Sequence, residues 1–327
     1  ALAEEIRRTR DLTDKPFGVN IAQAFVRDPC IIQFVIDQGV RFVTTSAGDP
    51  MKYTATLKAA GLTVFHVVPN LAGALRAVEA GVDGLIVEGG EGGGFKNAKD
   101  VSTMVLVPQV VAAVDVPVVA AGGIVDGRSM AAAFALGAEG VLMGTRILSA
   151  SECPVHDNWK QAIIDADATD TVFLNRSGPG PALRALRTKR TTRIEADGSP
   201  SIFAEFADTQ AVYFGGDLEA GIALTGQVAG RIDAVKPVAQ IFAETMAEYD
   251  EVVAALSADH PLAHSRRAGL VDLQHGTLLL GEAAMGTHLA RTVLKARRTA
   301  GFEADVRSVD PHLGLSSAIR NRPGAWS

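Results

Sequence analysis

The sequence predicts an α/β fold of the TIM type, in which parallel strands alternate with outer helices. Strand-like and helical stretches alternate along the chain, and the starts of successive strands lie 21 to 34 residues apart, the length of one βα unit. No long antiparallel section interrupts them, which favours a (β/α)8 barrel. An ordinary open α/β sheet is the alternative.

Six short apolar runs are the predicted strands, because continuous apolar runs are typical of strands buried on both faces. They lie at residues 17–21, 42–46, 63–68, 84–88, 118–121 and 141–145. Helical patterns fill the intervals at 28–38, 51–60, 71–80, 103–114 and 129–136, and recur at 157–166 and within 220–253. Residues 178–193, with two prolines and many basic side chains, are predicted to be an irregular surface segment.

Glycines stand at the far ends of the last two predicted strands, at Gly122–Gly123 and at Gly144. Glycine allows a ligand to come close to the backbone, and successive amides can hold a phosphate. In an eight-stranded barrel, the loops after the seventh and eighth strands are a frequent phosphate site. Tight turns without a ligand are the other explanation of these glycines.

The composition favours a globular cytoplasmic protein. Of the 327 residues, 47% are apolar, and the net charge of −6 argues against a nucleic-acid partner. Two cysteines, Cys30 and Cys153, fit a reducing compartment, and no metal-binding pattern is present. We expect no membrane span, because Pro108, Asp115 and Pro117 interrupt the most apolar stretch, and no signal peptide at residues 1–10.

Three motifs occur in a specific order: EGGEGGGF at residues 88–95, AAGGI at 120–124 and MGTR at 143–146. Together they resemble the nitronate monooxygenases, formerly called 2-nitropropane dioxygenases, which group with the FMN-dependent enoyl-acyl-carrier-protein reductases. The similarity extends over residues 1–255. It implies a TIM-type barrel that holds FMN at the carboxyl ends of its strands.

The resemblance also implies a set of cofactor-binding residues. They are Asn20, Glu88, Gly93, Gly94, Gly122, Gly123, Gly144 and Thr145. The last four are placed around the FMN phosphate, whereas Asn20 and Glu88 are placed near the flavin ring. A purely structural carboxylate that pairs with a backbone amide is the alternative for Glu88.

Phe95 departs from the family pattern. Many nitronate monooxygenases carry a histidine there as the base toward the substrate, and phenylalanine cannot take a proton. The catalytic base is therefore unknown, and Glu91, Lys96 and His66 are weak candidates. A lone histidine on an apolar strand is more often a satisfied core residue, and Phe95 packing over the flavin is the other interpretation.

Family members begin with two more βα elements than this sequence shows. Six strands do not close an eight-stranded barrel, and the open edge would expose unpaired backbone. We expect the numbered chain to lack these elements, as the residue Ala1 in place of Met suggests; completion by other segments is the alternative. Residues 1–257 are predicted to form the FMN-binding barrel, with a helical insertion or cap at about 157–235.

Residues 258–327 match nothing in the family pattern, and their role is unknown. Strands at 277–280 and 304–309, with a helix over 288–298, could form a further βα unit.

The resemblance implies an FMN-dependent oxidoreductase, and three functions stay open. The first is oxidation of a small activated carbon acid, such as a nitronate, with oxygen. The second is reduction of an enoyl thioester, with NAD(P)H as co-substrate, or oxidation of an acyl-CoA; here the missing histidine is a smaller obstacle. The third is a flavin-binding protein without catalysis. The expected partner is a small molecule or an acyl thioester, and a homo-oligomer is compatible with the sequence.

Overall fold

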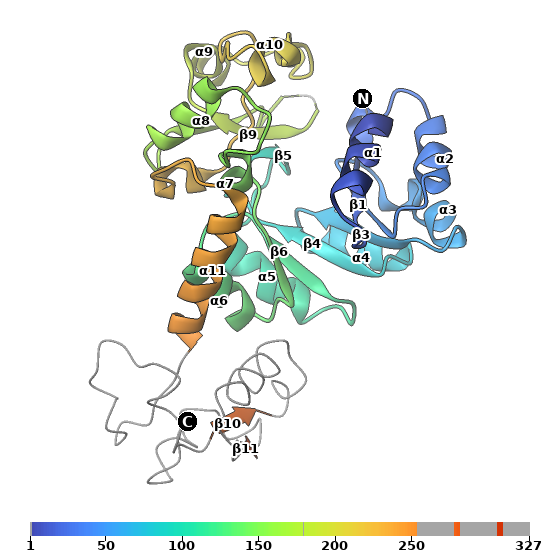
Figure 1. Cartoon of the computed structure of the whole chain (residues 1–327). Coiled ribbons are helices and arrows are strands. Elements are labelled where there is room, and N and C mark those ends of the chain that lie inside the picture. Colours follow the sequence, from blue (N-terminus) through green and yellow to red (C-terminus); the bar gives the residue numbers. More distant parts are fainter. Residues whose placement is uncertain (1, 179, 254–277, 282–305, 310–327) are drawn as a thin grey trace, which may run out of the picture. The chain divides into compact units, whose positions relative to one another are not determined.

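A six-stranded parallel sheet is the centre of the structure, a computed structural model that describes residues 2–178, 180–253, 278–281 and 306–309. Its strands are β1 (Gly18–Ala22), β2 (Phe42–Ser46), β3 (Thr63–Val68), β4 (Gly84–Glu88), β6 (Val118–Ala121) and β7 (Gly140–Leu142). Neighbours in the sheet follow chain order, and every pair is parallel. This arrangement confirms the predicted α/β architecture, and Figure 1 shows the sheet curled.

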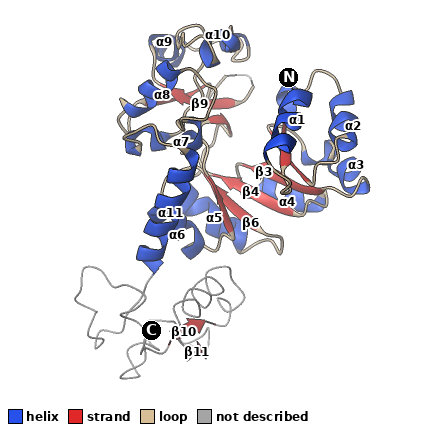
Figure 2. Ribbon diagram, viewed as in Figure 1, coloured by secondary structure: helices blue, strands red, loops and turns tan. Residues whose placement is uncertain are grey.

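A helix precedes the first strand, and a further helix lies between each strand and the next, as is usual for connections between parallel strands. The helices of this part are α1 (Leu2–Leu12), α2 (Cys30–Asp37), α3 (Thr54–Ala59), α4 (Leu71–Glu79), α5 (Thr103–Val111) and α6 (Gly127–Ala135). Helices α3 to α6 contact the strands next to them, and Figure 2 shows α4 to α6 against the sheet. Leu57, Leu85 and Leu106 are completely buried in the resulting core.

A small antiparallel sheet with order β5-β9-β8 stands apart from the parallel one. Strand β5 (Gly94–Lys96) belongs to the glycine-rich loop after β4, whereas β8 (Thr171–Leu174) and β9 (Ala182–Leu186) come from the later insertion. The insertion also contains α8 (Asp157–Ile164), α9 (Lys189–Asp197), the 3₁₀ turn η3 (Ala204–Phe206) and α10 (Thr209–Tyr213).

The insertion corrects two predictions. It is mixed α and β rather than helical, and residues 178–193 include the buried strand β9 and the start of α9 rather than an irregular surface segment. The basic side chain that suggested a surface, Arg184, is buried because the protein supplies its hydrogen bonds.

The last predicted strand of the sheet is also shorter than expected. Strand β7 ends at Leu142, and Thr145 already begins the short helix α7 (Thr145–Leu148). The prediction of 141–145 as one strand was wrong at its end, since the apolar run continues across the turn between the two elements.

Helix α11 (Val238–Val253) ends the first of two compact units, which divide between Val252 and Val253. In the second unit, β10 (Leu278–Gly281) and β11 (Val306–Val309) form a parallel pair. The predicted strands at 277–280 and 304–309 are confirmed there, whereas the predicted helix at 288–298 lies outside the described residues. Within the described ranges, no helix is long and apolar enough to cross a membrane.

The close contact of α6 with α11 generates a prediction about stability. A side chain at Gly127 would collide with the backbone of Tyr249 and Thr245 in α11. Gly127→Ala should therefore lower the free energy of unfolding by about 2 kcal/mol, a typical cost of overpacking.

Urea unfolding measures this loss. Gly140→Ala is the matched control, because a Cβ there would make only ordinary contacts with Val119. Equal stability of the two variants would contradict the tight packing at Gly127.

Candidate functional site

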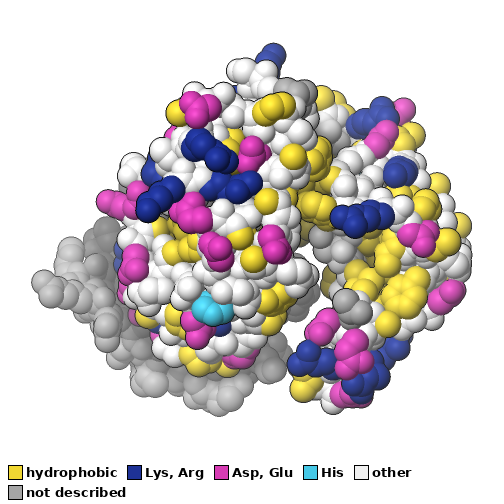
Figure 3. Space-filling model, turned by 90° about the horizontal axis from the view of Figure 1, so that it is seen from above, with side chains coloured by type: hydrophobic (Ala, Val, Ile, Leu, Met, Phe, Trp, Pro, Cys, Tyr) yellow, Lys and Arg dark blue, Asp and Glu magenta, His cyan; other side chains and the backbone are white. Residues whose placement is uncertain are grey.

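A cavity of about 940 Å³ opens at the carboxyl ends of the parallel strands. Five strands of the parallel sheet (β1, β2, β3, β4 and β7), β5 and the insertion all contribute to its lining. Among the lining residues are Asn20, Ser46, His66, Val68, Ile86, Glu88, Leu142, Phe95, Pro181 and Phe203. Figure 3 looks onto this face from above, and the surface there is hollowed. Its volume is at the upper end of the range for ligand pockets, so it can hold more than one small molecule.

An ion pair between Glu88 and Lys96 lies in the wall of the cavity. Lys96 Nζ is 2.5 Å from Glu88 Oε1; the Lys96 side chain is 2% exposed and that of Glu88 is 22% exposed. Burial lowers the pKa of Lys96, and the Glu88 carboxylate counteracts this in part. Since Lys96 Nζ has no well-aligned hydrogen bond among the described residues, Glu88 is its main compensation.

Gly92 leaves the room that this pair needs. A Cβ at position 92 would overlap Glu88 Oε1 and would come within 2.9 Å of Lys96 Nζ. The predicted candidate Lys96 is therefore enclosed although it lines the cavity, and Glu88 is the more exposed member of the pair.

Glu91, the second candidate base, is occupied by the start of helix α5. Its carboxylate accepts hydrogen bonds from Thr103 N at 3.0 and 3.1 Å and from Thr103 Oγ1 at 2.9 Å. An acidic side chain at a helix N-terminus is stabilised by the unpaired N–H groups there. Glu91 thus fixes the glycine-rich loop to α5 and is a structural residue.

Arg184, on strand β9, holds the same loop from the other side. Its Nε donates to Gly90 O at 2.6 Å and its Nη1 donates to Thr171 Oγ1 at 3.1 Å. Burial lowers the pKa of Arg184, yet a guanidinium remains charged at neutral pH. The sequence prediction missed this residue, because its partner is 94 positions away in the chain.

His66, the third candidate, is buried on β3 with its Nδ1 2.7 Å from Thr45 Oγ1 on β2. Burial lowers the pKa of His66, while a hydrogen bond with the Gly48 backbone and the charge of Asp49 raise it in part. The ring is therefore neutral at pH 7 and joins two strand ends. Its edge still lines the cavity.

The glycines after β6 and β7 differ from one another in conformation. Gly122 and Gly123 have φ of 83° and 81°, the left-handed region that other residues avoid. Gly144 has an ordinary φ of −87°, is exposed, and has no atom within 4 Å of the place where a Cβ would stand. The backbone therefore does not require glycine at 144, and the space beside it is open.

Thr145 and the consecutive glycines Gly93 and Gly94 lie where the segment at Gly226 packs against the glycine-rich loop. Thr145 Oγ1 accepts a hydrogen bond from Gly226 N at 2.9 Å. A Cβ at Gly93 would come within 2.7 Å of the Gly226 backbone, and Gly94 has a φ of 95°. Of these residues only Gly93 lines the large cavity, whereas Gly94 and Thr145 are buried beside it.

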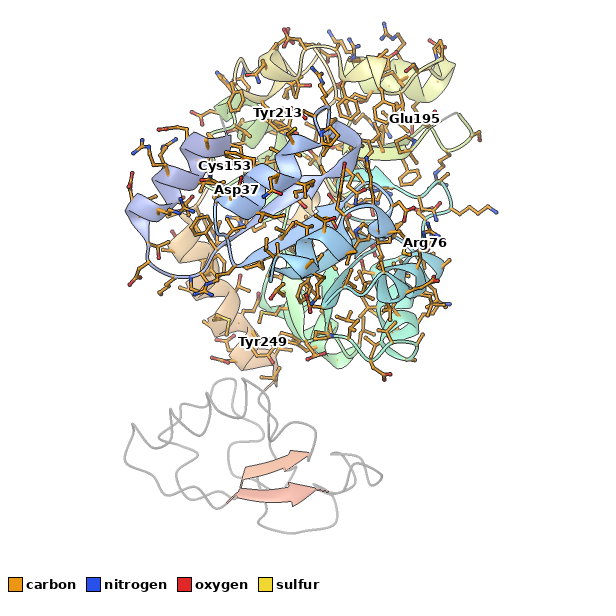
Figure 4. The ribbon with its side chains drawn as sticks, turned by 90° about the vertical axis from the view of Figure 1, so that its right-hand side faces the viewer. Asp37, Arg76, Cys153, Glu195, Tyr213 and Tyr249 are labelled. Carbon is orange, nitrogen blue, oxygen red and sulfur yellow. The ribbon has the colours of Figure 1, made fainter. Side chains whose placement is uncertain are left out.

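Asn20 and a charged pair lie at other points on the cavity wall. Asn20 is exposed on β1, and its Oδ1 accepts a hydrogen bond from Thr44 Oγ1 at 2.9 Å. Arg76, on α4 and labelled in Figure 4, binds Asp49 through two hydrogen bonds of 3.0 and 2.7 Å. The structure thus brings Asn20, His66, Glu88, Gly93 and Lys96 to one cavity.

Phe95 belongs to an aromatic wall that we define as Phe25, Phe95, Phe203 and Phe206. Its ring centroid lies 5.3 Å from that of Phe25, 6.1 Å from that of Phe203 and 5.9 Å from that of Phe206. The sequence prediction singled out only Phe95, since the other rings come from distant segments.

Comparison with known proteins gives a consistent result. The model of the family described as nitronate monooxygenase matches residues 23–248. The chain is 40% identical over 198 residues to a Rhodococcus jostii protein named (3aS,4S,5R,7aS)-5-hydroxy-7a-methyl-1-oxo-octahydro-1H-indene-4-carboxyl-CoA dehydrogenase, covering 61% of this chain and 55% of that protein. It is 32% identical over 219 residues to a probable nitronate monooxygenase of Staphylococcus saprophyticus, covering 53% of this chain and 62% of that protein.

Among solved structures, that of FabK from Thermotoga maritima superposes with a TM-score of 0.70 at 40% identity, covering 77% of this chain and 81% of that one. The chain spans less than two thirds of the length of the two curated relatives described above.

Substitution of Glu88 and substitution of Lys96 should lower the free energy of unfolding by different amounts. Glu88→Gln leaves a buried ammonium without a counter-charge and should cost about 3 kcal/mol. Lys96→Met leaves a carboxylate that water can reach and should cost about 1 kcal/mol. Urea unfolding of both variants at pH 7 checks the order, and a larger loss for Lys96→Met would show that the pair is arranged differently.

The buried His66 predicts a loss of stability in mild acid. Its folded-state pKa is below the ordinary 6.5, so below pH 6.5 the unfolded chain binds a proton that the folded chain resists. The free energy of unfolding should fall with pH there, by up to about 1.4 kcal/mol per unit. Unfolding curves between about pH 5 and pH 7.5 measure how the free energy of unfolding depends on pH. His66→Gln should make this dependence weaker, and an equal pH dependence in the variant would refute the role of His66.

Proposed function

Because the chain belongs to the nitronate monooxygenase family, a family of oxidoreductases, we propose that it is an FMN-dependent oxidoreductase whose substrate is an acyl thioester. In this proposal its six parallel strands are part of an eight-stranded barrel. The observation that carries the choice of substrate is the aromatic wall, in which Phe95 takes the position where many nitronate monooxygenases carry a histidine base. The Rhodococcus jostii relative, whose name describes a carboxyl-CoA dehydrogenase, supports the same class of substrate.

The residues at the strand ends fit FMN. Open space at Gly144, the positive φ of Gly122 and Gly123, and the Thr145 hydroxyl together suit a phosphate held by backbone amides. Asn20 and Glu88 would supply an amide and a carboxylate for the polar edge of the flavin ring, and Gly93 leaves room beside them in the cavity wall. When bound, FMN supplies hydride transfer.

The protein's own residues would then bind and orient the thioester. Phe95 and Phe203 exclude water from one side of the cavity, which strengthens the electrostatic interactions inside it. Glu88, fixed by Lys96, would supply a partly exposed carboxylate to the cavity, whereas the carboxylate of Glu91 is occupied by Thr103. Oxidation of an acyl-CoA and reduction of an enoyl thioester with NAD(P)H are the two directions of this chemistry.

Nitronate oxidation with oxygen is the second candidate, favoured by the family model and by the staphylococcal relative. Mixing flavin-loaded protein with each substrate without oxygen distinguishes the two. We expect an acyl-CoA, or NAD(P)H followed by an enoyl-CoA, to change the flavin spectrum faster than propyl nitronate does. Faster reduction of the flavin by the nitronate would favour nitronate oxidation over the thioester function. No reduction of the flavin by any substrate would indicate a flavin-binding protein without catalysis.

The open space at Gly144 predicts a selective loss of FMN. Gly144→Val fits the backbone and collides with nothing in the protein, so it should leave stability within about 0.5 kcal/mol while flavin retention is abolished. Gly144→Ala should give an intermediate loss. The flavin absorbance of the purified protein measures retention, with Gly140→Ala as control; full occupancy in Gly144→Val would contradict the assignment.

A further inference from the structure

The four rings of the aromatic wall come from three separate segments of the chain. Phe25 follows β1 at the end of the 3₁₀ turn η1 (Gln23–Phe25), Phe95 is the centre of β5, and Phe203 and Phe206 belong to the insertion. Phe25 and Phe206 also contact each other, with ring centroids 5.9 Å apart and an edge-to-face angle of 89°. Convergence of these segments is therefore a property of the folded site and not of local sequence.

Two rings of the wall stay open to solvent. Phe25 is 52% exposed and Phe203 is 47% exposed, while Phe95 between them is half-buried. Scattered apolar side chains on a surface are common, but contiguous aromatic groups beside a cavity mark a binding site. No described residue covers the open faces of these two rings.

The wall is continuous with the polar end of the cavity. Phe95 and Phe203 line the same cavity as Glu88, and Phe95 precedes Lys96 in β5. Lys96 lines the cavity as well. The cavity therefore combines the charged pair Glu88–Lys96 with the aromatic rings of Phe95 and Phe203.

We infer that the aromatic wall binds the apolar part of the substrate's acyl group, and that this part is a rigid ring system rather than a short chain. The inference rests on the proposed function, which it makes specific. Flat aromatic faces in tilted contact present broad apolar surface, which a ring can cover at little cost in conformational entropy. A nitronate of a few carbon atoms would leave most of the wall exposed.

Binding of unreactive ligands to the flavin-loaded protein tests the inference. 2-Naphthoyl-CoA carries a bulky ring, whereas acetyl-CoA has no β-carbon and cannot be desaturated. Calorimetry should give a dissociation constant at least about tenfold lower for 2-naphthoyl-CoA. Phe203→Ala and Phe25→Ala should each remove most of this ratio and should leave the affinity for acetyl-CoA nearly unchanged.

Phe242→Ala is the matched control, because Phe242 is 53% exposed on α11 and does not line the cavity. It should leave the ratio as in the unmodified protein. A ratio that survives both Phe203→Ala and Phe25→Ala, or that falls equally in Phe242→Ala, overturns the inference.

2-Naphthamide, which carries the ring without CoA, separates this inference from the proposed function. If no thioester binds but Phe203→Ala abolishes binding of 2-naphthamide, the thioester function fails and the aromatic site stands. If thioesters bind with an affinity that does not depend on the ring or on the wall, the function stands and the inference fails.

Discussion

The hydrogen bonds that fix the glycine-rich loop are the constraint on which the whole site depends. A loop of five glycines between residues 89 and 94 has little conformational preference of its own. Glu91 ties it to the first turn of α5, and Arg184 ties Gly90 O to strand β9. Because both side chains are charged and satisfied, the loop is held in one conformation from two sides.

That fixed loop determines what surrounds the cavity. It presents Glu88 at its beginning and Phe95 and Lys96 at its end, so the charged pair and the aromatic wall keep their places relative to the strand ends. It also positions β5 for antiparallel pairing with β9. This pairing connects the loop to the insertion, which contributes Pro181 and Phe203 to the cavity wall. Loss of either anchor, Glu91 or Arg184, would displace both the charged pair and the aromatic wall.

The sequence predicted the parallel sheet well because buried parallel strands are continuous apolar runs between glycine, proline and polar turns. It could not predict β5, since three residues beside a run of glycines carry no strand signal, or β9, where a basic residue indicated a surface. The site followed the same division. Asn20, Glu88 and Gly93, which the family resemblance placed near a cofactor, line the cavity. Arg184 and Phe203 carry no such signal, because they reach the site only through contacts distant in the chain.

The pairing of β5 with β9 has a consequence for how such a site can change over time. The glycine turns belong to the repeating strands, whereas half of the aromatic rings belong to a segment that begins beyond α7. Substitutions around Phe203 and Phe206 would therefore reshape the aromatic wall and leave the glycine turns of the parallel sheet unchanged. The lining of the cavity can thus vary in one segment independently of the sheet that supports it.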